Sequence, residues 1–290
     1  MKKLLAIILA VVMVLSLAAC GGGGAEPTKK PVTYPKFLGK LDSHASCENY
    51  EMYLWNEHTQ RKVYGLEWIP NGFNKESGEK LPAIIFVHGN RGGALDFKPS
   101  IIELAESGIA SFSMECCGAN TTPKSDPGEA TTSSRASDLD TMFKYVQTLD
   151  WIDQDRIYIW GQSHGGMTVM LYAPTQKDTI AGMIVESMSV MSDNNDPYTE
   201  GEGAVPAFIP TGKGLLDWYK EYNGDVIISC SVKDAGPHSG GEFTEALYAS
   251  REKGTAKFYS CPEGGHGINS FSDEGQKITY DAVRALILGE

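Results

Sequence analysis

A serine between glycines, at the end of an apolar segment, limits what this chain can fold into more than any other feature. Residues 156–160 read as a strand, residues 161–165 are Gly-Gln-Ser-His-Gly, and residues 167–173 read as a helix that ends at Pro174. Glycine two positions before and after Ser163 leaves room for the strained backbone of a sharp strand-to-helix turn. Such a turn would expose the Ser163 hydroxyl and point the first amides of the helix at the same spot.

Strand and helix patterns alternate along most of the chain. Strands are predicted at 50–53, 62–69, 83–87, 109–114, 157–160, 180–185, 225–229 and 257–260. Helices are predicted at 95–107, 134–149, 167–173, 214–222, 242–251 and 273–286. This alternation predicts an α/β fold with a mostly parallel central sheet and helices on both faces. With 290 residues, 41% of them hydrophobic, we expect one catalytic domain over 36–290.

The first 35 residues predict a targeting signal and a tether rather than part of the folded domain. Residues 1–19 combine a positive start, an apolar stretch and a small-residue cleavage site, which is typical of a signal peptide. Leu17-Ala18-Ala19-Cys20 resembles a bacterial lipobox, which implies that Cys20 is lipidated and that the protein is anchored at the bacterial cell surface. An ordinary signal peptide with an incidental cysteine is the alternative. Residues 20–35 are expected to form a flexible tether.

Two further residues complete a catalytic set with Ser163. A serine hydroxyl needs a histidine to take its proton and an acid to orient that histidine. Asp234 and His266 follow Ser163 in the order Ser, Asp, His, and each comes just after a predicted strand. Because the carboxyl ends of parallel strands meet at one edge of a sheet, we expect all three side chains there. His238 is the rival base, and Glu186, which ends the preceding strand, is the rival acid.

The segment after the strand at 83–87 predicts the rest of an oxyanion-binding site. His88-Gly89-Asn90 resembles the H-G-x signature that α/β-hydrolases carry after this strand, which implies that the Asn90 backbone amide binds the oxyanion together with the His164 amide. Arg91 is interpreted either as a solvated charge or as a ligand for an acidic group of the substrate.

The stretch from Asp138-Leu139-Asp140 through Trp151-Ile152-Asp153 to the turn at Ser163 resembles the α/β-hydrolase superfamily. It is similar to dienelactone hydrolases, acetyl xylan or feruloyl esterases and prolyl oligopeptidase catalytic domains, and the resemblance covers about residue 50 to the end. It implies hydrolysis through an acyl-enzyme, with no metal or organic cofactor. Serine replaces the cysteine typical of dienelactone hydrolases, and no large N-terminal domain is expected, so an esterase is favoured.

The remaining expectations concern substrate and partners. We expect a carboxylic ester, such as a small-molecule or carbohydrate ester; a peptidase acting on short peptides, or an inactive binding protein, are the alternatives. The net charge of −12 argues against nucleic acid as a partner, and contact with the membrane is expected only through the lipid anchor. No metal-binding motif is present.

Residues 189–223 are either a lid or a surface excursion. Cys230 and Cys261 end neighbouring predicted strands, where a bridge or two free thiols both fit. The oligomeric state stays open.

Overall fold

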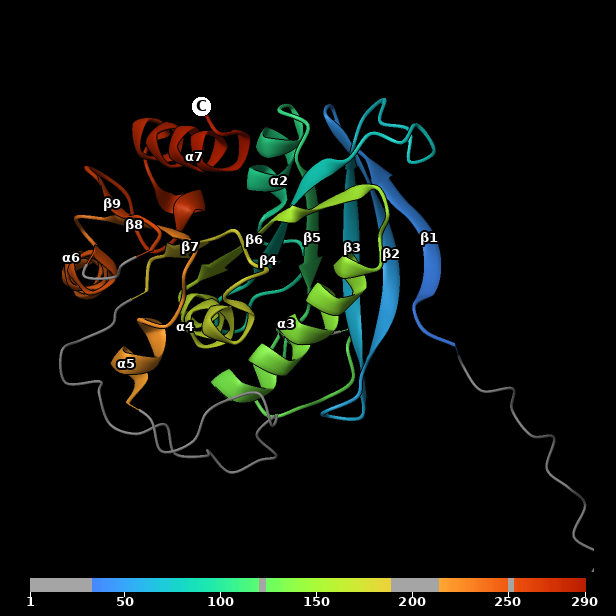
Figure 1. Cartoon of the computed structure of the whole chain (residues 1–290), viewed down its shortest axis with the longest axis horizontal. Helices are drawn as coiled ribbons and strands as arrows, with labels where there is room; N and C mark the ends of the chain where they lie inside the picture. Colours follow the sequence, from blue (N-terminus) through green and yellow to red (C-terminus); the bar gives the residue numbers. More distant parts are fainter. Residues whose placement is uncertain (1–32, 120–123, 189–213, 250–252) are drawn as a thin grey trace, which may run out of the picture. The chain divides into compact units, whose positions relative to one another are not determined.

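One mixed sheet of nine strands organises the computed structural model, which describes residues 33–119, 124–188, 214–249 and 253–290 (Figure 1). The strand order is β1-β2-β3-β5-β4-β6-β7-β8-β9. The strands are β1 (Lys36–Ser43), β2 (Cys47–Asn56), β3 (Arg61–Pro70), β4 (Leu81–Val87), β5 (Ala110–Met114), β6 (Ile152–Gln162), β7 (Gly182–Glu186), β8 (Asp225–Ser231) and β9 (Ala256–Cys261).

Most of this sheet is parallel, as predicted. The six strands from β5 to β9 in the spatial order run parallel, whereas β1, β2 and β3 are antiparallel to their neighbours. Strands that run the same way end at the same edge, so the segments that follow β4, β6, β7, β8 and β9 all leave the sheet there. The fold therefore brings together segments that lie far apart in the sequence, from the end of β4 at Val87 to the end of β9 at Cys261.

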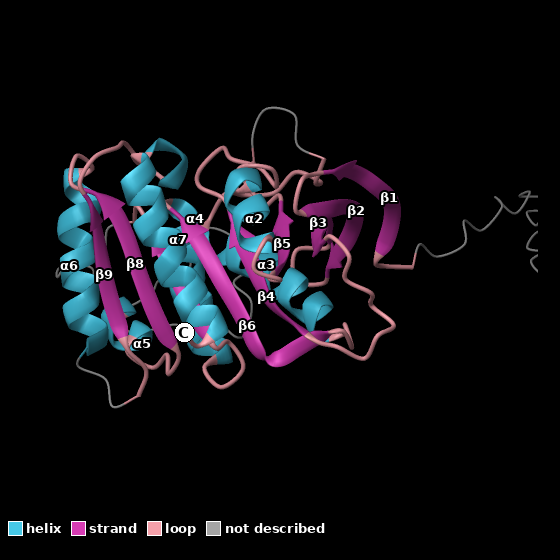
Figure 2. Ribbon diagram, turned by 90° about the horizontal axis from the view of Figure 1, so that it is seen from above, coloured by secondary structure: helices cyan, strands magenta, loops and turns pink. Residues whose placement is uncertain are grey.

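Helices cover both faces of the sheet (Figure 2). The helices are α2 (Lys98–Ala105), α3 (Thr132–Gln147), α4 (His164–Tyr172), α5 (Leu215–Tyr219), α6 (Ala235–Ala249) and α7 (Asp273–Leu288). Side chains of α3, α4 and α6 share one apolar core with the sheet, and those of α2 and α7 share another. In β4, Ile85 faces the first core while Ile84 and Phe86 face the second. Burial on both faces explains why this strand is apolar throughout.

Two elements differ from the sequence-based prediction. β1 was not predicted, because all its residues are exposed and the pattern carries no alternation; two register shifts against β2 interrupt its pairing. Helix α6 begins at Ala235 instead of 242, because the segment holds Pro237 and three glycines that weaken a helical pattern. Pro237 is tolerated because it lies in the first turn, where backbone N–H groups have no partner within the helix.

Several sequence-based predictions concern residues outside the described ranges. The signal peptide at 1–19, Cys20, most of the tether and residues 189–213 of the predicted lid lie outside the described residues. The helix α5 lies where a helix was predicted at 214–222. In the described ranges, the helices are all too short or too polar to cross a membrane.

Candidate active site

Ser163 lies between β6 and α4 in a strained backbone conformation, with φ of 53° and ψ of −118°. Its amide donates to the Glu186 carbonyl at 2.8 Å. The flanking glycines are required by close backbone approach: a Cβ on Gly161 would lie 2.1 Å from the Gly165 carbonyl oxygen, and a Cβ on Gly165 would lie 2.0 Å from the Val87 carbonyl oxygen. The sharp turn expected from the sequence is therefore formed, with Ser163 at its tip.

Asp234 and His266 form a hydrogen-bonded pair at the same edge of the sheet. Asp234 follows β8, His266 follows β9, and Asp234 Oδ2 lies 2.6 Å from His266 Nδ1. An ionised carboxylate only accepts hydrogen bonds, so Nδ1 is the donor and Nε2 is left to accept a proton. The Asp234 side chain is 18% exposed and that of His266 48%, which leaves the imidazole accessible to a substrate.

The loop that carries His266 lies against the turn that carries Ser163. A Cβ on Gly267 would lie 1.8 Å from Gln162 Nε2, so the residue after His266 touches the residue before Ser163. The φ of Gly267 is 89°, a conformation that favours glycine. No hydrogen bond joins the Ser163 hydroxyl to His266 in the part of the chain that is described, so the proton-transfer contact of the triad stays a prediction.

Glu186, the rival acid, has other partners. Its Oε2 accepts from Trp160 Nε1 at 2.7 Å, and its Oε1 accepts from the Ile268 amide. Its side chain is fully buried. His266 is therefore hydrogen-bonded to Asp234, while Glu186 lies beneath the histidine loop.

His238, the rival base, also lies in different surroundings. Its Nε2 is 2.8 Å from Ser260 Oγ, and its ring packs edge-on against Phe258 with centroids 5.2 Å apart. Only its backbone contacts Asp234, through an amide that donates to the Asp234 carbonyl at 2.9 Å. The aspartate side chain is thus left to His266.

The loop after β4 approaches Ser163 closely. A Cβ on Gly89 would lie 3.4 Å from the Ser163 Cβ. Among the described residues, neither the Asn90 nor the His164 backbone amide has a protein acceptor. The His164 ring lies 3.2 Å from Thr132 Oγ1, and burial lowers its pKa to about 4, so it is neutral at pH 7. Two amides beside Ser163 are thus free for an anionic oxygen, and the roles predicted for them stay predictions.

A buried polar network holds this loop from behind. His88 Nδ1 donates to the Gly89 carbonyl at 2.7 Å, and His88 Nε2 accepts from the Cys116 amide at 3.0 Å. Burial and the nearby Arg135 lower the pKa of His88 to about 3, so the ring is neutral. The Arg135 guanidinium donates to the carbonyls of His88 and Cys117. His88 and Arg135 therefore fix the backbone that leads to Asn90.

Arg135 and Asp138, three residues apart on α3, had no predicted role in the site. Asp138 is fully buried and accepts from Arg61, from Asn56 Nδ2 at 2.8 Å and from the Cys117 amide at 2.8 Å. A signal was present: in the predicted helix at 134–149, Arg135 stands four residues before Leu139, on the apolar face. A charge at such a position predicts a buried polar network.

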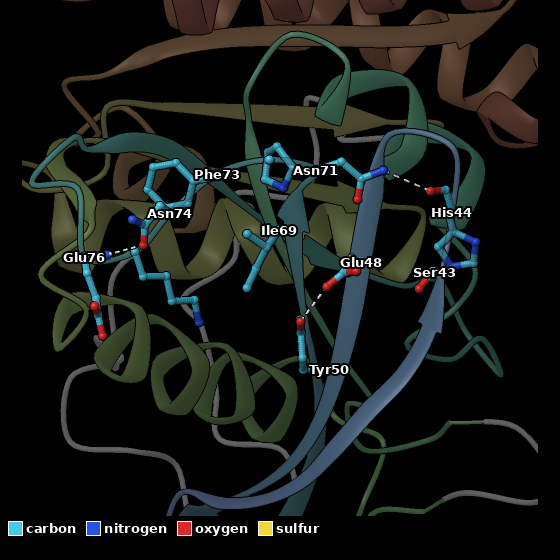
Figure 3. Close-up of a pocket in the computed structure, with 12 residues that line it drawn as sticks. Ser43, His44, Glu48, Tyr50, Ile69, Asn71, Phe73, Asn74 and Glu76 are labelled. Carbon is cyan, nitrogen blue, oxygen red and sulfur yellow. Dashed lines mark hydrogen bonds between the residues drawn. The ribbon is translucent and has the colours of Figure 1, made fainter.

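A pocket of about 730 Å³ lies elsewhere, over β2, β3 and the loop that follows β3 (Figure 3). Tyr50 donates to Glu48 there at 2.6 Å, and Asn71 Nδ2 donates to the His44 carbonyl at 3.1 Å. None of the predicted catalytic residues lines this pocket. Strands β5 and β4 lie between β3 and β6 in the sheet, so the pocket is separated from the turn of Ser163.

The five described cysteines are buried free thiols. In the pairing of β8 with β9, Cys230 lies opposite Ser260, and Ser231 lies opposite Cys261. Side chains of successive strand residues point to opposite faces, so the two thiols face away from each other and no bridge forms. Within the described ranges, no cluster of three or more His, Cys, Asp or Glu side chains is suited to a metal ion.

Comparison with known proteins agrees with this architecture. Residues 82–211 match the family described as alpha/beta hydrolase fold. A search of curated proteins finds no significant match. The strand order, the strained serine turn and this match together show that the chain has the α/β-hydrolase fold, as its sequence resemblance predicted.

Solved structures give the same fold. The Est1E protein of Butyrivibrio proteoclasticus, solved with ferulic acid, is 20% identical with a TM-score of 0.61, over 82% of this chain and 98% of that chain. A putative dienelactone hydrolase from Klebsiella pneumoniae is 17% identical with a TM-score of 0.63, over 83% and 99%. Acetyl xylan esterase 1 from Thermoanaerobacterium sp. is 16% identical with a TM-score of 0.61, over 88% and 89%.

Proposed function

We propose that this chain is an extracytoplasmic serine hydrolase that cleaves carboxylic esters of small molecules or carbohydrates. The observation that carries the proposal is the 2.6 Å contact between His266 and Asp234, on a loop that touches the strained turn of Ser163. The similarity to structures of a protein solved with ferulic acid and of an acetyl xylan esterase supports an ester as the substrate.

The reaction would run in two halves. Ser163 Oγ attacks the ester carbonyl carbon while His266 Nε2 takes its proton, and Asp234 stabilises the resulting imidazolium. The Asn90 and His164 amides hold the oxyanion of the tetrahedral intermediate. The bond to the alcohol then breaks, and His266 returns the proton to the departing oxygen. Water attacks the acyl-enzyme by the same route, which releases the acid and restores Ser163.

Labelling with a fluorophosphonate tests the nucleophile. We expect covalent label on Ser163 and a loss of about 10³-fold or more in kcat for Ser163→Ala, because the serine forms the acyl-enzyme. The matched control is Ser111→Ala, a buried serine on β5 whose hydroxyl has no hydrogen-bond partner among the described residues. Absence of label, or full turnover by Ser163→Ala, would contradict the proposal.

A substrate panel separates the alternatives. Acetyl, butyryl and feruloyl esters should be hydrolysed faster than aminoacyl arylamides. The reverse order would support a peptidase, and binding of a panel member without turnover would support an inactive binding protein.

We also propose that Cys20 carries a lipid that anchors the protein at the extracytoplasmic face of the membrane, as Leu17-Ala18-Ala19-Cys20 indicates. Expression in a bacterium with a labelled fatty acid should give a labelled protein in the membrane fraction. Cys20→Ser should lose the label and leave that fraction. Label on Cys20→Ser, or an unlabelled wild type, would overturn the anchor.

A further inference from the structure

Glu186, the last residue of β7, contacts both halves of the candidate site. Its backbone carbonyl accepts from the Ser163 amide at 2.8 Å. Its carboxylate accepts from the Ile268 amide, two residues after His266, and from Trp160 Nε1 at 2.7 Å. One residue thus bonds to the turn of the nucleophile and to the loop of the histidine.

The neighbouring Ser187 adds a second contact to the same loop. Its hydroxyl accepts from the Gly267 amide at 2.9 Å, and its own amide donates to the Ser229 carbonyl at 2.8 Å. The φ of Ser187 is 46°, an unusual conformation for a serine. The chain therefore turns sharply at the end of β7 so that two successive side chains hold the amides of residues 267 and 268.

We propose that Glu186 is a positioning residue of this hydrolase, whose carboxylate holds the His266 loop in register with Ser163. The inference rests on the proposed function and adds a residue outside the triad and the oxyanion-binding amides. Both carboxylate oxygens are occupied by N–H donors, so Glu186 acts through the loop and not by contact with the imidazole.

The surroundings of Glu186 favour this role over a stabilising one. Its fully buried side chain is faced by the Trp160 ring of β6, the Cys261 thiol of β9, the Tyr280 hydroxyl of α7 and the Ile268 amide. No lysine or arginine among the described residues neutralises it. Burial raises the pKa of Glu186 to about 7, although both N–H donors favour the charged form. A buried carboxylate without a neighbouring cation lowers the stability of the fold. We therefore assign Glu186 to positioning the His266 loop rather than to stabilising the protein.

The test is Glu186→Gln, which keeps size and shape but replaces one acceptor oxygen by an NH₂ group that must face an N–H donor. We expect kcat to fall by roughly 10- to 100-fold with KM nearly unchanged, since a small displacement of a catalytic group has such an effect. Hydrogen exchange of the amides at 267 and 268 should accelerate. The matched control is Glu67→Gln, a buried carboxyl on β3 that bonds to Lys75 and Tyr145, and it should keep wild-type kcat.

The wild type supplies an independent measurement. Because the N–H donors to both carboxylate oxygens favour an ionised Glu186, kcat/KM of the wild type should fall more steeply toward acid pH than kcat/KM of Glu186→Gln. A kcat of Glu186→Gln within about twofold of wild type, an equal loss in Glu67→Gln, or the same acid pH dependence of kcat/KM in the wild type and Glu186→Gln would overturn the inference. Absence of fluorophosphonate label on Ser163 would instead contradict the proposed function.

Discussion

Buried ionisable side chains set the local geometry around the candidate site, and each differs from its ordinary chemistry for a stated cause. His88 is neutral because burial and Arg135 lower its pKa to about 3, whereas burial raises the pKa of Glu186 to about 7. Neither residue belongs to the predicted triad. Both hold backbone that carries a predicted catalytic group, which is Asn90 for His88 and His266 for Glu186.

The raised pKa of Glu186 predicts a pH-dependent term in stability. Its ordinary pKa is 4.5 and its pKa in the folded protein is about 7, so the folded state binds more protons between these values. The contribution of Glu186 to the free energy of unfolding is therefore fully present below pH 4.5 and is lost as pH rises through 7. Denaturant unfolding should show that the wild type loses on the order of 3 kcal/mol relative to Glu186→Gln between pH 4 and pH 8.

The comparison of wild type with Glu186→Gln isolates the effect of Glu186 on stability, because other titratable groups such as His88 contribute equally to both proteins. The same difference in unfolding free energy at pH 4 and pH 8 would show that Glu186 titrates normally.

Among the elements, α3 combines two tasks. Leu139 and Met142 pack into the core on the sheet, while Arg135 and Asp138 on the same helix bond to the loops after β4 and β5. Its N-cap, Thr131, accepts from the Ser134 amide at 3.1 Å and fixes where the helix begins. Helix α3 therefore fixes the predicted oxyanion-binding loop relative to the sheet, because it packs on the sheet and bonds to the loop.

Removal of the charge on Asp138 should damage this arrangement. Asp138→Asn leaves the buried Arg61 guanidinium without its carboxylate, so we expect a loss of about 3–5 kcal/mol in unfolding free energy. The matched control is Asp281→Asn, an exposed carboxylate on α7 that pairs with Lys277 and Arg284, and it should cost less than about 1 kcal/mol. Equal effects of the two variants in urea unfolding would show that the buried pair has no special weight.

At the scale of the whole molecule, the parallel sheet explains why distant residues meet. The turn at Ser163, the segment that holds Asp234 and the loop of His266 follow β6, β8 and β9, which end at one edge (Figure 1). The same arrangement places Glu186, at the end of β7, between the serine and the histidine. The first strand, β1, extends the sheet on the opposite side by pairing with β2.

The sequence alone determined the fold class and its candidate residues, because these depend on local signals: apolar periodicity, glycines around a serine, and the order of Ser163, Asp234 and His266. The tertiary structure decided what depends on packing between distant segments. It paired His266 with Asp234, turned Cys230 away from Cys261 and buried Glu186 beneath the histidine loop. Such contacts arise only when strands take their register in the sheet, since a neighbour across the sheet leaves no trace in the adjacent sequence.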